Sequence, residues 1–127
     1  MSPRWMKPLF VVAALYDGIL GVGVALFALP LFNWFGVTPP NHVGYVQFPA
    51  LLLLIFAAMF WRIAQDPAGN RALIPYGISL KVAYCALVFW YQLTSAVPFM
   101  WVPWAWLDLG FIVLFVIAWK ATPAQAA

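Results

Sequence analysis

Three ionisable side chains lie inside segments that are otherwise apolar: Asp17, Lys81 and Asp108. A lone charge at the centre of a membrane-spanning helix costs about 2.5 to 3.5 kcal/mol, so three unpaired charges would cost roughly 8 to 10 kcal/mol. That is comparable with the stability of a whole domain. We therefore expect the lysine to pair with carboxylates. Such residues also form proton relays and binding sites.

The segments that carry these charges are predicted to be membrane-spanning helices. The chain is 67% hydrophobic and 7% charged, whereas a soluble domain carries about a quarter charged residues. A bilayer core takes about 20 apolar residues of helix, and four stretches qualify, at about 8–29, 43–63, 73–93 and 99–119. They predict one all-α transmembrane domain, 1–127, that forms a four-helix bundle.

The cations indicate how this bundle is oriented. They precede the first stretch, flank the second connection and follow the fourth stretch: Arg4, Lys7, Arg62, Arg71 and Lys120. The first and third connections contain no lysine or arginine. Since cytoplasmic loops are enriched in these residues, we predict an up-down-up-down bundle with both termini cytoplasmic.

The helical rise predicts that the three charges meet. Counted from the cytoplasmic helix ends, Asp17 and Lys81 lie roughly 10 to 12 Å deep and Asp108 roughly 16 Å deep. Side chains lean toward the N-terminus of their helix, so Asp17 and Lys81 should lean toward the cytoplasm and Asp108 away from it. We therefore expect Asp17 to pair with Lys81. Asp108, as surplus acid, is expected to take up a proton.

Two interpretations of this cluster stay open. It can act as a structural polar contact that holds the first, third and fourth helices together, or as a functional site. Tyr84 shares a helical face with Lys81, and Trp101 and Trp104 lie outward of Asp108. These tryptophans and Gln47 could form a vestibule, although rings at this level are also typical of an interfacial aromatic belt. The second helix carries no charge apart from Arg62 at its end, so we expect it to face lipid or another protein.

Motifs for known chemistries are missing from the sequence. There is no cluster of ligands at metal spacing, no Gly-rich phosphate loop and no basic run that would favour nucleic-acid binding. His42 stands alone in a loop, and Cys85 is the single cysteine. An enzymatic function therefore has little support, and no cofactor is predicted.

Several short stretches resemble those of a loose group of small bacterial membrane proteins, called DoxX-like. They are the segment from Pro30 to Gly36, the turn QDPAGNR, the lysine of ISLK and the aspartate of WLDLGF. The resemblance implies a four-helix inner-membrane bundle with polar residues in the third and fourth helices, here Lys81 and Asp108. The first helix differs, because it carries Asp17 where such proteins tend to have basic residues.

These observations lead to three functional hypotheses. The first is a non-enzymatic accessory subunit or homo-oligomeric scaffold, since four short helices and short loops leave little room for a soluble site. The second is a small proton-coupled carrier that uses Asp17, Lys81 and Asp108. The third, implied by the resemblance and the aromatic vestibule, is a redox helper that binds a quinone or a lipid.

Overall fold

Four α-helices make up most of the computed structural model, which describes residues 3–123. They are α1 (Met6–Trp34), α2 (Gly44–Gln65), α3 (Ile74–Thr94) and α4 (Val102–Ala121). Two 3-10 turns, η1 (Arg71–Leu73) and η2 (Phe99–Trp101), precede α3 and α4. No strand occurs within residues 3–123, so the predicted all-α class is confirmed.

Each of the four helices is long and apolar enough to cross a membrane. Their outward faces are apolar as well: Leu26 on α1 is 70% exposed, and Ile55 on α2 and Leu87 on α3 are more than half exposed. Soluble monomers rarely expose apolar surface on this scale. The exposed faces therefore fit a lipid environment.

The first helix is longer than predicted, because it continues five residues beyond Leu29 to Trp34. Proline usually ends or kinks a helix, since it lacks the backbone N–H and its ring crowds the carbonyl four residues earlier. Here α1 keeps Pro30 inside and departs from helical geometry at Phe27 instead. The proline thus redirects the last turns of the helix.

Two prolines, Pro98 and Pro103, make the start of the fourth helix irregular. Pro98 immediately precedes the turn η2. Pro103 occupies the first turn of α4, where a backbone N–H would make no helical hydrogen bond in any case, so its absence costs nothing. This turn brings Met100 and Trp101 beside the start of α4, next to the site described below.

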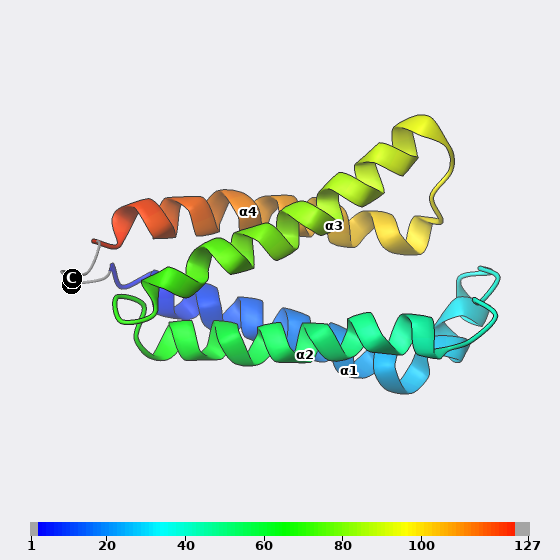
Figure 1. Cartoon of the computed structure of the whole chain (residues 1–127), viewed down its shortest axis with the longest axis horizontal. Coiled ribbons are helices and arrows are strands. Elements are labelled where there is room, and N and C mark those ends of the chain that lie inside the picture. The colour runs from blue at the N-terminus through cyan, green and yellow to red at the C-terminus, as the bar shows by residue number, and fades with distance from the viewer. Residues whose placement is uncertain (1–2, 124–127) are drawn as a thin grey trace.

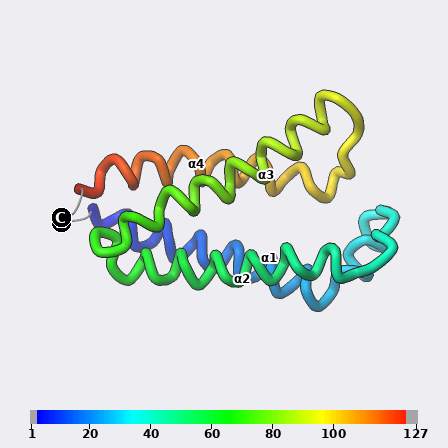
Figure 2. The backbone as a smooth tube through the Cα atoms, viewed as in Figure 1, coloured from blue at the N-terminus to red at the C-terminus, as the bar shows by residue number. Residues whose placement is uncertain are grey.

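The helices pack as two antiparallel hairpins, α1 with α2 and α3 with α4. Figure 1 shows that α1 begins and α4 ends at one end of the molecule, where α2 also passes into α3. The other two connections lie at the opposite end. The backbone in Figure 2 shows that the hairpins approach each other near the terminal end and diverge toward the other.

An aromatic core closes the terminal end between the hairpins. Phe10, Phe60 and Phe115 are fully buried there, and the ring of Phe115 lies 5.0 Å from that of Phe10 and 5.2 Å from that of Phe60. Aliphatic residues and alanines of all four helices complete this core, among them Ala13 and Ile74. The hairpins are therefore joined at one end by packing.

Small residues set the closest helix contacts. A β-carbon added to Gly21 of α1 would lie 2.8 Å from the carbonyl oxygen of Ala50 on α2, and one added to Gly77 of α3 would lie 2.5 Å from the ring of Phe60. Both distances are too short for a real side chain. Glycine is therefore required at these crossings, as is common where helices pack within a membrane.

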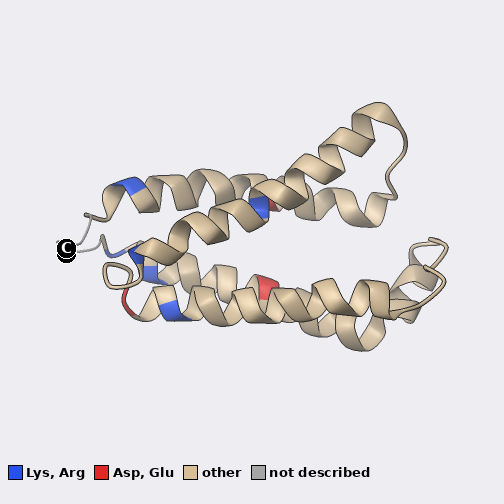
Figure 3. Cartoon of the chain, in the orientation of Figure 1, with Lys and Arg blue, Asp and Glu red and all other residues tan. Residues whose placement is uncertain are grey.

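Charged residues occupy two levels of the molecule (Figure 3). Most lysines and arginines gather at the terminal end, and a smaller group of one basic and two acidic residues lies about halfway along the bundle. The third aspartate, Asp66, is in the connection that follows α2. The halfway group is the candidate site.

Candidate functional site

The three charges predicted to meet form a buried cluster. The Lys81 ammonium donates a 2.7 Å hydrogen bond to Asp17 Oδ1, and it lies 3.0 Å from Asp108 Oδ1. Lys81 and Asp17 are each at most 1% exposed, and Asp108 is 6% exposed. Since α1, α3 and α4 each contribute one residue, the cluster links the two hairpins.

The two carboxylates contact Lys81 differently. Asp17 makes both an ion pair and a hydrogen bond, whereas Asp108 makes an ion pair without hydrogen-bond geometry. Asp17 is therefore the better partner, as the sequence predicts. The outward lean expected for Asp108 does not separate it from Lys81, because the long lysine side chain reaches between the helices.

Aromatic rings surround the rest of the lysine ammonium. Its nitrogen lies 4.8 Å from the ring centre of Tyr16, 5.2 Å from that of Phe111 and 5.8 Å from that of Phe60. Ring faces attract cations within about 6 Å. Lys81 is thus enclosed by two carboxylates and three rings. The sequence did not predict a role for Tyr16, because it looks like any other aromatic residue of an apolar segment, although it lies beside Asp17.

Some oxygens near the cluster have no hydrogen-bond partner. Asp17 Oδ2 and the Tyr16 hydroxyl are both buried and unpaired within the described residues. Buried polar groups are normally hydrogen-bonded, so unpaired ones call for an explanation. Both residues line the same cavity.

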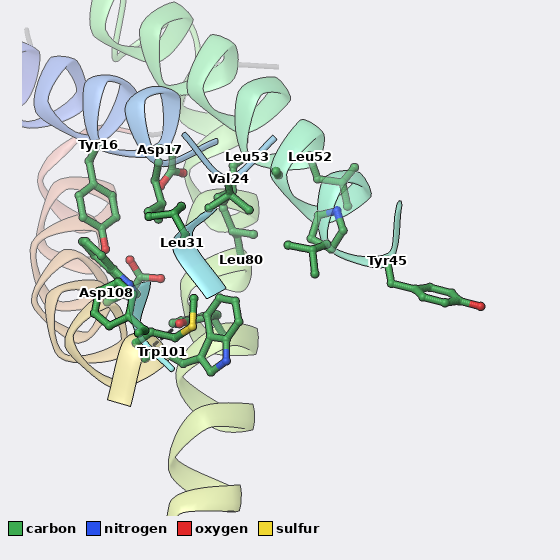
Figure 4. Close-up of a pocket in the computed structure, with 18 residues that line it drawn as sticks. Tyr16, Asp17, Val24, Leu31, Tyr45, Leu52, Leu53, Leu80, Trp101 and Asp108 are labelled. Carbon is green, nitrogen blue, oxygen red and sulfur yellow. Dashed lines mark hydrogen bonds between the residues drawn. The ribbon is translucent and has the colours of Figure 1, made fainter. Parts of the chain in front are cut away.

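A cavity of about 480 Å³ lies between the hairpins, with walls from all four helices and η2. It extends from Tyr16, Asp17 and Asp108 to Leu31 and Tyr45, near the α1–α2 connection. Figure 4 shows the side chains around it. Most are apolar, including Leu20, Val24, Pro49, Ala50, Leu53, Leu80 and Met100. Lys81 does not line the cavity, whereas Tyr16, Asp17 and Asp108 do, so the acids of the cluster belong to its polar end.

The tryptophans divide between the two roles left open by the sequence. Trp101 and Trp104 line the cavity, and the ring of Trp104 lies 6.2 Å from that of Tyr16. Trp90 and Trp106 instead point outward and are about 60% exposed. The predicted vestibule and an outward-facing set of rings are therefore both present, in different residues.

Two predicted site residues have other contacts. Tyr84 lines the cavity, but its hydroxyl donates to the carbonyl of Trp101 over 2.7 Å and makes no hydrogen bond with the cluster. Gln47 was expected in the vestibule. It instead donates to the carbonyl of Ala25 and does not line the cavity, because its face of α2 is turned toward α1. Gln47 thus ties the first hairpin together.

The second helix was expected to face lipid or another protein, and one of its faces also forms part of the cavity wall. Val46, Pro49, Ala50 and Leu53 line the cavity. No charge or motif distinguishes these residues in the sequence, because the wall of an apolar cavity has the same composition as a lipid-facing surface.

The fold and site define a class of protein: a bundle of four helices capable of crossing a membrane, with an apolar cavity that ends on a buried carboxylate–lysine–carboxylate cluster. Comparison with models of known families, with curated proteins and with solved structures finds no match to this chain. The function is therefore argued from the site.

Proposed function

We propose that this protein is a membrane-embedded binding protein for a small amphipathic molecule, held in the cavity between the hairpins. The observation that carries the proposal is the cavity of about 480 Å³ with apolar walls and oxygen atoms at one end. Ligand sites are typically hollows of about 300 to 1,000 Å³ with apolar walls and a few polar groups that orient the ligand.

The buried charges support binding over a purely structural role. A staple between helices needs only one carboxylate for one lysine, and the Asp17–Lys81 pair already supplies that. Asp108 adds a second acid at the cavity wall, at a cost in desolvation. A ligand that contacts the carboxylates would offset this cost.

We propose the bacterial inner membrane as the location, with the terminal end of the bundle in the cytoplasm. The cations gathered at this end support the orientation, because cytoplasmic loops are rich in lysine and arginine (Figure 3). The likeness to DoxX-like proteins stays a prediction. It is compatible with a bound quinone or lipid in the cavity.

Proton-coupled transport is the second candidate. The cavity reaches toward one end of the bundle, and the core around Phe10, Phe60 and Phe115 closes the other end. A carrier has this arrangement in one of its two states. The accessory or scaffold role would need a partner on an outer face. Lipid covers such apolar faces equally well, so they do not favour that role.

Blocking the cavity tests the proposal. Val24 lines it, and Val24→Trp should fill much of the space, whereas Val113→Trp places the same ring on an exposed face of α4. Native mass spectrometry of protein in nanodiscs should find a bound small molecule on the wild type and on Val113→Trp, and much less on Val24→Trp. Equal occupancy in all three proteins would contradict binding in this cavity.

A further inference from the structure

The polar end of the cavity is lined by Tyr16, Asp17 and Asp108, whose side chains carry oxygen atoms. The Tyr16 hydroxyl and Asp17 Oδ2 are buried and have no hydrogen-bond partner among residues 3–123. The Lys81 ammonium, which could have served as a donor, is enclosed by its carboxylates and rings and does not line the cavity. A ligand at this end therefore lies beside carboxyl-bearing residues and no ammonium group.

The charge around this end is unbalanced. The titratable groups are Tyr16 and Asp17 from α1, Lys81, Tyr84 and Cys85 from α3, and Asp108 from α4; α2 adds only Tyr45, at the far end of the cavity. Within residues 3–123, no lysine or arginine lines the cavity. With both carboxyl groups ionised, two negative charges face one ammonium, which leaves a surplus of one negative charge.

The two aspartates are not equally available to a ligand. The side chain of Asp17 is 1% exposed and is held by the hydrogen bond from Lys81. That of Asp108 is 9% exposed and has no hydrogen bond. Asp17 therefore neutralises the lysine, and Asp108 carries the surplus charge on the cavity side.

The adjoining wall is aromatic, with Trp101, Trp104, Tyr16 and Tyr84. Ring faces bind organic cations, and tryptophan does so most strongly. A carboxylate beside such rings is the arrangement that recognises ammonium groups. With a neutral or anionic headgroup, a proton on Asp108 would be needed to compensate the surplus charge.

We propose that the cavity binds small organic ammonium ions, with the cationic group between Asp108 and the ring faces and the apolar part along α1 and α2. This inference rests on the proposed function and names the class of ligand. The binding step breaks no covalent bond in the ligand; where Asp108 carries a proton beforehand, that proton leaves to water as the cation enters.

The test compares two probes of the same shape. Benzyltrimethylammonium is a permanent cation, and neopentylbenzene is its uncharged carbon counterpart. Each is dialysed against nanodiscs that contain the wild type, Asp108→Asn or Asp66→Asn, with empty nanodiscs as the blank. Comparing proteins for one probe cancels its partition into lipid. Asp66→Asn removes the same charge from a loop outside the cavity.

We expect Asp108→Asn to weaken binding of the cation at least tenfold, equivalent to about 1.4 kcal/mol, and to change binding of the neutral probe less than twofold. Asp66→Asn should bind both probes as the wild type does. Equal binding of the cation by the wild type and Asp108→Asn would overturn the inference. So would a result in which the wild type binds the anion benzenesulfonate more tightly than it binds the cation.

The two levels of the proposal fail in different ways. In one case, Val24→Trp abolishes binding of the neutral probe, but binding of the cation does not depend on Asp108. The cavity is then a binding site, and only the proposed class of ligand is wrong. If neither probe is retained above empty nanodiscs, binding in the cavity is refuted as well. Equal loss of both probes in Asp108→Asn would show damage to the cavity and contradict the specific role of Asp108.

Discussion

Replacing either aspartate of the cluster by asparagine should have unequal effects on stability, although both changes remove one negative charge beside Lys81. At an effective dielectric constant of about 20, the attraction to Lys81 is about 6 kcal/mol at 2.7 Å, for Asp17, and about 5.5 kcal/mol at 3.0 Å, for Asp108. These values are nearly equal. Coulomb attraction therefore does not decide which change is worse.

The hydrogen bond and the charge balance decide it. Only Asp17 accepts a hydrogen bond from Lys81, and a bond between charged groups contributes about 1.5 to 3 kcal/mol, roughly twice that of a neutral one. Asp17→Asn should therefore lower the free energy of unfolding by about 2 kcal/mol. Asp108→Asn should cost less than about 1 kcal/mol, because it leaves the hydrogen-bonded Asp17–Lys81 pair neutral.

Denaturant unfolding of the reconstituted variants in mixed micelles measures both values. Lys81→Met is the reference for a broken cluster, because removing one partner of a buried pair costs about 3 to 5 kcal/mol. Combined with Asp17→Asn, it should cost less than the two single losses added, by more than the average of about 0.6 kcal/mol found between membrane polar groups. An Asp108→Asn loss equal to or larger than that of Asp17→Asn would refute this assignment of partners.

Two further predictions concern orientation and helix contacts. If the cations mark the cytoplasmic side, a cysteine placed at Thr38 should react with an impermeant thiol reagent added to intact cells, and one placed at Gly69 should not. The reverse labelling pattern would show that the protein has the opposite orientation. Gly77→Ala should destabilise the fold by about 1 to 3 kcal/mol in thermal unfolding, since the added carbon meets the ring of Phe60. The control Gly110→Ala, which has open space around the added carbon, should be neutral or stabilising. Equal effects of the two changes would contradict the packing at the α3 crossing.

The sequence was sufficient to predict the four helices and the meeting of Asp17, Lys81 and Asp108. Both predictions rest on the same physical cause, which is the high cost of a charge or an unpaired backbone group in a lipid environment. That cost leaves few arrangements for three charges that lie at similar depths. The choice of Asp17 as the hydrogen-bonded partner followed from side-chain direction along the helix.

The cavity and the ring enclosure of Lys81 depend on tertiary structure. Tyr16, Val24 and Leu53 have neighbours in the sequence that are equally apolar but face outward, because all-round hydrophobic helices show no periodicity that separates a lipid-facing side from an inner wall. The divergence of the hairpins beyond the Phe10–Phe60–Phe115 core decides which side chains line the hollow. That divergence arises from contacts between helices far apart in the chain, and it turns a buried ion cluster into the polar end of a binding cavity.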